Sequence, residues 1–173
     1  QRLSNGLTVV LEHLPHVHSS SIGVWVRTGS ANETAAQAGI SHFLEHLFFK
    51  GTTRRSPREL MHAIESRGGQ MNAFTSREYT CLYVKCLTAH LPVGIEILAD
   101  VLKNAVYADM EKERNVILEE IAASIDVPEE YAHDVLTEAF WPNHALGRPI
   151  AGSIESVSAI TLDDVVEYKE YWY

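Results

Sequence analysis

The residues with the clearest capacity for chemistry lie in the run His42-Phe43-Leu44-Glu45-His46. On a helix, residues four positions apart share a face, so the imidazoles of His42 and His46 would stand next to each other. At about 100° per residue, Glu45 falls on the same side as both histidines. Two neighbouring imidazoles can bind one zinc ion through ring nitrogens at roughly 2.0–2.1 Å. The run therefore predicts a metal site with a carboxylate beside it.

The helix that must present this run is itself predicted by the sequence. Its span, about Gly39 to Phe49, carries apolar residues spaced i, i+3, i+4, i+7 and i+8, the stripe of a helix that packs on a core. The members of that stripe are Ile40, Phe43, Leu44, Leu47 and Phe48. The two histidines and Glu45 fall on the opposite side of the helix. Gly51 stands where a C-terminal cap is common.

A metal site of this kind needs a third ligand, and a predicted helix from Met110 to Ile125 offers four glutamates. Glu113 and Glu120 are two turns apart on one line of that helix and are flanked by apolar residues, so both are expected to face inward. An inward-facing carboxylate needs a partner charge or a metal. Glu119 falls on the polar side and is expected to be a solvated surface acid. Glu120 is the candidate ligand, with an ordinary boundary acid as the alternative.

The spacing H-x-x-E-H is the motif of inverted zincins. It reverses H-E-x-x-H, in which the glutamate is the general base beside the metal water. The chain contains 9 histidines and 17 glutamates, so a chance match is a real alternative. In that case the run would be no more than a solvated polar helix face.

The bulk composition is that of one globular domain of 173 residues, with 46% apolar and 21% charged residues. The formal net charge of −9 argues against a nucleic-acid partner, which needs a basic surface, and is compatible with a basic peptide. No apolar run approaches 18 residues, so no membrane span is expected. The composition does not identify the compartment. Cys81 and Cys86 are expected to be buried and unpaired, because they point to opposite faces of a strand.

Alternation and capping signals predict an α+β fold, with a mostly antiparallel sheet and helices packed on one face. The predicted extended segments are Leu3–Leu14, a hairpin-edge strand with a turn at Asn5-Gly6, then Ser21–Thr28 and Met71–Leu87. Besides the two helices above, further helices are expected from Pro57, over Pro92–Ala105 and Pro128–Phe140, and after Thr161. So few strands for so many helices predict a fold that is incomplete at its C-terminus.

Four blocks of sequence, in this order, resemble the pitrilysin family of zinc metallopeptidases, and most closely the mitochondrial processing peptidase β subunits and their bacterial relatives. The blocks are G-I-S-H-F-L-E-H-L-F-F-K-G-T, M-N-A-F-T-S-R-E-Y-T, E-R-N-V-I-L-E-E-I and H-A-L-G-R-P-I-A-G. The likeness extends from Leu3 to Tyr171. Four blocks in order are far more specific than the metal motif alone.

The resemblance implies a role for each residue that matches the family pattern. It implies that His42, His46 and Glu120 bind Zn²⁺ and that Glu45 is the general base for the zinc-bound water. It also implies that Glu113 is a carboxylate close to the site. The expected activity is that of a zinc endopeptidase acting on peptide or unfolded polypeptide substrates.

The resemblance further implies that the segment Asn72, Ala73 and Phe74 pairs with the substrate backbone as an added strand. That is physically reasonable, because an exposed sheet edge offers hydrogen bonds to an extended peptide. The alternative is an ordinary edge strand. A peptide-binding module without a metal would depend on this edge alone.

The resemblance also sets expectations for the domain organisation. Residues 1–173 correspond to a single N-terminal zinc-binding domain, whereas family enzymes close a second, C-terminal domain around the substrate. The expected partner is therefore a C-terminal half or a partner subunit, or a second copy in a homodimer, and the chain alone is expected to be a poor peptidase. A non-catalytic structural or partner subunit of the same fold is the alternative function.

Overall fold

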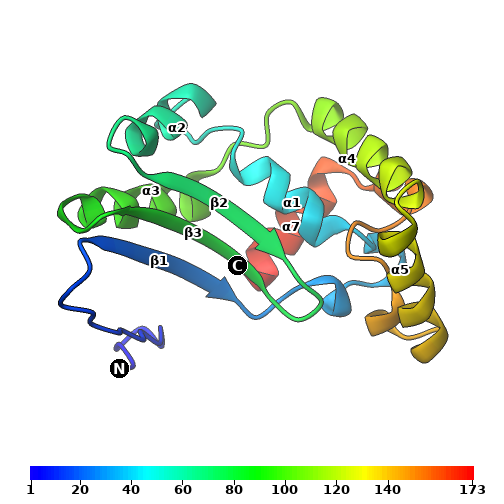
Figure 1. Ribbon diagram of the computed structural model, residues 1–173. Coiled ribbons are helices and arrows are strands. Elements are labelled where there is room, and N and C mark those ends of the chain that lie inside the picture. Colours follow the sequence, from blue (N-terminus) through cyan, green and yellow to red (C-terminus); the bar gives the residue numbers. More distant parts are fainter.

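Three antiparallel strands form one sheet, and the helices cover one of its faces, as Figure 1 shows for the computed structural model of residues 1–173. The strands are β1 (Ser19–Val26), β2 (Gln70–Thr75) and β3 (Thr80–Leu87), in the order β1-β3-β2. The predicted α+β architecture is confirmed. Because β3 is central, β1 and β2 are both edge strands.

Seven α-helices complete the fold. They are α1 (Ile40–Phe48), α2 (Pro57–Glu65), α3 (Leu91–Asn104), α4 (Met110–Ile125), α5 (Pro128–Phe140), α6 (Ile154–Ala159) and α7 (Leu162–Trp172). Short 3₁₀ turns lie at Ser30–Asn32, Ala35–Gln37, Thr88–His90 and Ala145–Gly147. The predicted start of α2 is confirmed, since Ser56 and Glu59 form a reciprocal capping box. No helix is both long enough and apolar enough to cross a lipid bilayer.

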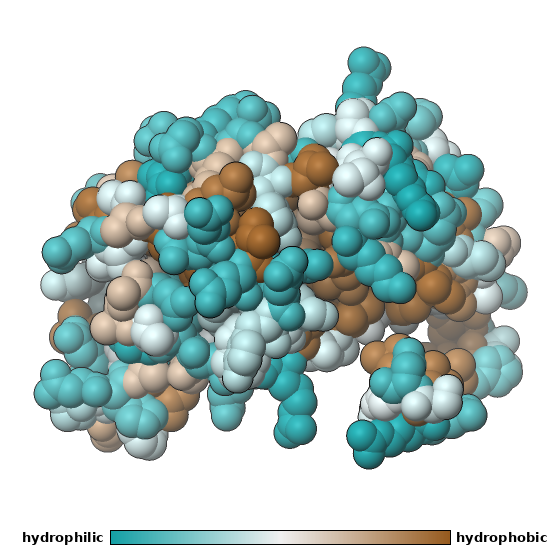
Figure 2. Space-filling view, turned by 180° about the vertical axis from the view of Figure 1, so that it is seen from behind, coloured by the Kyte–Doolittle hydropathy of each residue, from teal (hydrophilic) through white to brown (hydrophobic).

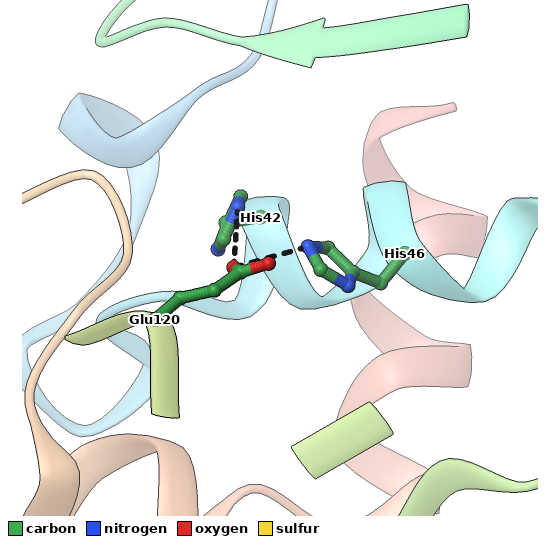
Figure 3. A group of neighbouring side chains, drawn as sticks. All are labelled: His42, His46 and Glu120. Atoms are coloured by element: carbon green, nitrogen blue, oxygen red, sulfur yellow. Dashed lines mark ion pairs between the residues drawn. The ribbon is translucent and has the colours of Figure 1, made fainter. Parts of the chain in front are cut away.

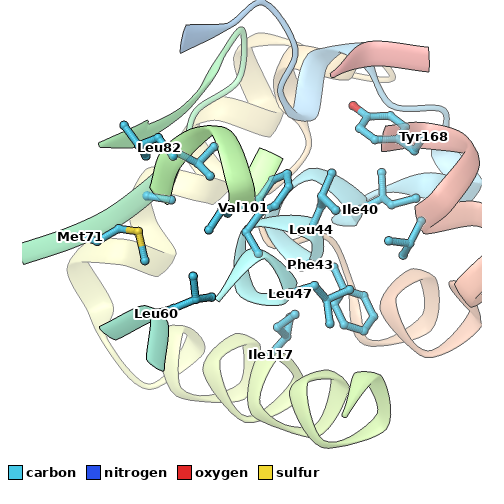
Figure 4. Packing of buried hydrophobic residues seen from close by; sticks show 14 of the residues in the cluster. Ile40, Phe43, Leu44, Leu47, Leu60, Met71, Leu82, Val101, Ile117 and Tyr168 are labelled. Atoms are coloured by element: carbon cyan, nitrogen blue, oxygen red, sulfur yellow. The ribbon is translucent and has the colours of Figure 1, made fainter. Parts of the chain in front are cut away.

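The core lies between the helices and the inner face of the sheet (Figure 4). Strand residues on that face, such as Leu82 and Val84, are completely buried. The five apolar residues predicted to form the stripe of α1 all have no exposed surface. The helix that carries the histidines is therefore the centre of the core, and its polar side faces away from it. Both cysteines are buried and free, as expected.

The predicted hairpin strand over Leu3–Leu14 forms only in its first part. The Asn5-Gly6 turn is present, and backbone hydrogen bonds and a bridge between Arg2 and Thr8 join the residues on its two sides. The later residues form no strand, and Val10 and Leu11 are 90% and 82% exposed. In Figure 2 this N-terminal segment is the small lobe at the lower right, separate from the body and partly hydrophobic. The alternation is present, but no strand in the described chain pairs with the segment, and a strand without a partner leaves its backbone hydrogen bonds unmade.

Two further differences concern the local structure. The segment Met71–Leu87 is not continuously extended, because a turn at residues 76–79 folds it into the β2–β3 hairpin. Helix α6 was not predicted at all. It has six residues and starts at a capping box of Ser153 and Ser156, which is too short to show a helical period.

Candidate metal centre

Helices α1 and α4 bring three of the predicted ligands together (Figure 3). The Nε2 atom of His46 lies 3.5 Å from Glu120 Oε2, and the Nε2 atom of His42 lies 3.8 Å from the same oxygen. One ligand atom from each residue falls within 4.8 Å of the other two. The two imidazoles come from neighbouring turns of α1, and the carboxylate comes from the facing side of α4.

This arrangement fits a tetrahedral zinc ion. Ligand atoms about 2.0–2.1 Å from a tetrahedral ion stand about 3.4 Å from one another, close to the distances between the Nε2 atoms and the Glu120 oxygen. Two histidines and one glutamate form a known ligand set of catalytic zinc sites, which keep a fourth position open. The side chain of Glu120 is 47% exposed, more than its apolar flanks predicted, because it faces an open groove rather than the core.

The environment of His42 suits a neutral metal ligand. Burial and, to a smaller extent, the charge of the neighbouring His46 lower the pKa of His42 to about 4. The imidazole is therefore uncharged at neutral pH, the form that has a lone pair for a metal. Its contact with Glu120 is consequently not an ion pair at that pH. The Nδ1 atom of His42 is buried and has no hydrogen-bond partner, whereas Nε2 faces the carboxylate.

Glu45 is held by the adjacent sheet edge. The hydroxyl of Thr75, the last residue of β2, donates a 2.6 Å hydrogen bond to Glu45 Oε2. Burial raises the pKa of Glu45, and the hydrogen bond from Thr75 opposes that shift. Glu45 and His46 together line a cavity of about 220 Å³. Because Oε2 accepts the hydrogen bond from Thr75, Oε1 is the carboxylate oxygen that remains available as an acceptor.

Glu113 lies on the other side of His46. Its carboxylate is buried, with Oε2 located 3.4 Å from His46 Nδ1 and Oε1 located 2.7 Å from the Nζ of Lys50. This confirms the predicted position of Glu113, which faces inward and lies next to the site. The imidazole of His46 therefore lies between two carboxylates, with Nδ1 facing Glu113 and Nε2 facing Glu120.

The start of α1 is fixed by a second buried carboxylate. Glu33 accepts 2.8 Å hydrogen bonds from the backbone N–H groups of Gly39 and Ser41. Burial raises the pKa of Glu33. The Arg148 guanidinium donates to the backbone oxygen of Glu33, so the block H-A-L-G-R-P-I-A-G packs against the beginning of the histidine helix. A β-carbon at Gly39, whose φ is +94°, would lie 2.5 Å from the backbone oxygen of Ala151.

The three residues expected to bind substrate are not equivalent. The backbone of Ser76 donates to the carbonyl of Tyr79, which places Phe74 and Asn72 in hydrogen-bonded pairs with β3 and leaves Ala73 facing the free edge. The Ala73 N–H is occupied by Asn72 Oδ1 at 2.9 Å. The side chain of Phe74 lies on the outer face of the sheet, against Trp25. Of these three residues, only Ala73 can therefore offer backbone groups to an added strand.

An open groove of about 1230 Å³ begins at Glu120 and extends between α4, α5 and the segment before α6. Six of its lining residues are acidic and only one is an arginine, so the groove has a negative potential. The acidic residues are Glu120, Glu129, Glu130, Asp134, Glu138 and Glu155. The sequence analysis did not identify this groove, because it is formed by elements that meet only in the folded chain.

Sequence reasoning also missed Thr75, Lys50 and Glu33. Lys50 did carry a signal, since it follows His46 by four residues and continues the same helix line. Thr75 and Glu33 belong to segments outside the two ligand helices. No spacing along the chain relates either of them to the site.

The chain is similar in sequence to several known proteins. A family model described as Insulinase (Peptidase family M16) matches residues 8–154. A zinc protease of Bacillus subtilis, YmxG, is 45% identical over 98% of this chain and 42% of its own length. A zinc protease of Mycobacterium leprae is 48% identical over 92% of this chain and 36% of its own. The mitochondrial-processing peptidase subunit beta of Lentinula edodes is 40% identical over 96% of this chain and 36% of its own.

Solved structures show the same fold. A protease from Helicobacter pylori superposes with a TM-score of 0.93 at 28% identity, over 100% of this chain and 42% of that one. A peptidase M16 inactive domain from Pseudomonas fluorescens has a TM-score of 0.81 at 13% identity, over 89% of this chain and 38% of that one, which shows the fold alone.

The chain spans about two fifths of the length of the curated relatives it matches. Those relatives include zinc proteases, so Zn²⁺ is the metal that the family implies for the cluster of His42, His46 and Glu120. The family model covers residues 8–154, which is most of the chain. On that match, the chain belongs to the insulinase family of peptidases, peptidase family M16.

Proposed function

We propose that the polypeptide carrying this chain is a zinc-dependent endopeptidase that hydrolyses extended polypeptides, with Glu45 as general base. The observation that carries the proposal is the position of Glu45. Its carboxylate interacts electrostatically with His46 and Glu120, accepts a hydrogen bond from Thr75, and lines a cavity with His46. This placement supports a role as the base that acts on a water beside the metal.

Each residue has a defined task in this scheme. His42, His46 and Glu120 would hold the ion, which supplies a Lewis acid that polarises the peptide carbonyl and makes a water more acidic when it is bound. Glu45 Oε1 takes a proton from the water while the water oxygen bonds to the carbonyl carbon of the peptide. The same oxygen then gives a proton to the leaving nitrogen as the C–N bond breaks. Thr75 keeps Oε2 occupied, so that Oε1 carries the proton.

The substrate would lie along the free edge of β2 as an added strand. Ala73 offers its backbone N–H and carbonyl there once the side chain of Asn72 moves aside. The acidic groove beside Glu120 favours peptides that carry lysine or arginine next to the extended segment. Both features select unfolded, positively charged chain segments over folded proteins.

A non-catalytic subunit of the same fold is the alternative, and the fold is shared with a domain described as inactive. The decisive experiment uses the longer polypeptide that contains this chain, with an unstructured basic peptide as substrate. Cleavage should stop with a chelator and return with zinc. Glu45→Gln should keep its zinc and lose about 10²- to 10⁴-fold in kcat. Equal cleavage by Glu45→Gln and the wild type would show that Glu45 is not the base.

A matched control is Glu119→Gln, which changes the exposed glutamate next to Glu120 on the polar side of α4. This variant should bind zinc and cleave peptides like the wild type. If the wild type binds zinc but cleaves no peptide under any of these conditions, the non-catalytic alternative is correct.

A further inference from the structure

The side chain of Lys50 lies at the end of the candidate metal centre. Lys50 follows His46 by four residues and His42 by eight, and so continues the line of the two histidines into the turn that ends α1. Its Nζ atom is 2.7 Å from Glu113 Oε1. The side chain of Glu113 is only 6% exposed, whereas that of Lys50 is 29% exposed.

The contacts alternate between the two helices. Glu120 of α4 contacts His42 and His46, and Glu113 of α4 contacts His46 and Lys50. Within this row, Lys50 is the group at hydrogen-bond distance from Glu113, because His46 Nδ1 is farther away at 3.4 Å. A buried carboxylate without a partner is strongly unfavourable, so the lysine sets where the Glu113 oxygens stand.

We infer that Lys50 is a positioning residue of the metal centre. Its ammonium group fixes the Glu113 carboxylate, and that carboxylate holds the His46 ring so that Nε2 faces the metal position. The inference rests on the proposed function only in assigning His46 to the metal. Carboxylates that orient a metal-binding histidine through its second nitrogen are common, and their loss lowers metal affinity by about 10- to 100-fold. Lys50 adds one further residue to this arrangement, because it orients the carboxylate that orients His46.

The position of Lys50 distinguishes this role from that of an ion pair that only stabilises the packing of two helices. Lys50 contacts neither Glu111 nor Glu119, the two exposed acids of α4 that face no candidate ligand. It instead contacts Glu113, the carboxylate of α4 that faces Nδ1 of the candidate ligand His46. An ion pair that only stabilised packing would stabilise the folded chain without changing its affinity for zinc.

The test measures zinc affinity of the longer polypeptide by competition with a chromophoric chelator. Lys50→Met should bind zinc about tenfold or more weakly than the wild type. Lys50→Arg, which keeps the charge, should recover most of that loss. Lys112→Met is the matched control, because Lys112 is an exposed lysine next to Glu113 in sequence, and its zinc affinity should stay at the wild-type value.

A second comparison avoids leaving a buried charge unpaired. Glu113→Gln and the double variant Lys50→Met/Glu113→Gln should bind zinc equally, since Lys50 acts through Glu113 and has nothing left to position. Equal zinc affinity of Lys50→Met and Lys112→Met would overturn the inference. So would a further loss of affinity on adding Lys50→Met to Glu113→Gln. These readouts are independent of peptide cleavage, so zinc binding by an inactive wild type would reject the endopeptidase proposal and leave the role of Lys50 intact.

Discussion

Thr75 donates a 2.6 Å hydrogen bond to Glu45 Oε2, and this contact connects the last residue of an edge strand to the candidate base on the histidine helix. Thr75→Val keeps the shape of the side chain and removes the donor. A hydrogen bond to a charged group contributes about 1.5–3 kcal/mol. Because Glu45 is only half-buried, kcat is expected to fall about tenfold, near the lower end of that range.

The controls for Thr75 separate orientation from damage to the metal site. Thr75→Ser keeps a hydroxyl and should restore most of kcat. Zinc content and KM should equal those of the wild type in both variants, because only the Thr75 side chain changes, and that side chain contacts Glu45 and the Ser41 carbonyl but no candidate ligand. A Thr75→Ser enzyme as slow as Thr75→Val would show that the hydroxyl is not what matters.

Zinc binding should depend on each of the three candidate ligands. His42→Ala, His46→Ala and Glu120→Ala each leave two ligands, which is too few for a stable site, so zinc should fall from one ion per chain to near zero. The measurement is elemental analysis after dialysis. His62→Ala removes an exposed histidine of α2 and should leave the zinc content unchanged. Full zinc occupancy in His42→Ala would rule out the assigned site.

Strand addition at β2 makes a prediction about proline. Ala73→Pro removes an N–H that faces the free edge, a position where proline is tolerated in sheets. One hydrogen bond is worth about 1 kcal/mol net, so KM for an extended peptide should rise about fivefold with unchanged zinc content. Phe74→Pro removes an N–H that faces β3 and should instead lower the thermal stability. Equal KM for Ala73→Pro and wild type would argue against substrate binding at this edge.

Glu33 should give the folded chain a measurable pH dependence. Burial raises its pKa above the ordinary value of 4.5, more than its two backbone hydrogen bonds and Arg148 lower it. Over an interval above pH 4.5 the folded chain therefore keeps a proton that the unfolded chain has lost. In that interval the free energy of unfolding falls as pH rises. Tyr168 and Tyr173 are the other titratable groups that interact with Glu33, and both are neutral in this range.

The measurement is urea unfolding of the wild type and Glu33→Gln from about pH 4 to about pH 7. Relative to the variant, which cannot ionise, the wild type should lose stability as pH rises. Glu59→Gln is a control of opposite sign, because hydrogen bonds from Ser56 lower the pKa of Glu59. Relative to Glu59→Gln, the wild type should gain stability as pH rises toward 4.5. A difference between wild type and Glu33→Gln that does not vary with pH would contradict the prediction.

Much of the candidate site could be predicted because it depends on helix periods. The period of α1 groups His42, Glu45 and His46, and the period of α4 aligns Glu113 with Glu120. These are local relationships, and the folded chain brings the two groups together. Their roles in metal binding and catalysis stay predictions. Thr75 could not be found in the same way, because its relation to Glu45 depends on how β2 packs against α1.

The fold shows the same division between local and long-range information. Helices with strong end signals were predicted well, and α4 and α5 begin and end at the predicted residues. The hairpin turn at residues 76–79 lacks glycine, proline, asparagine and aspartate, and Ser76 alone is too weak a turn signal to mark it. The alternation in Leu3–Leu14 is typical of a strand, but a strand also requires a neighbour, and alternation does not reveal whether one is present.

The row of contacts between α1 and α4 restricts how these helices can change in length. Earlier residues of α1 meet later residues of α4, so the two helices run in opposite directions where they touch. His42 to Lys50 spans about 12 Å and Glu113 to Glu120 spans about 10.5 Å at the rise of a helix. Inserting or deleting one residue between Glu113 and Glu120 would rotate one carboxylate by about 100°. Sequence changes there can alter residue types, but the seven-residue interval must persist wherever both contacts are retained.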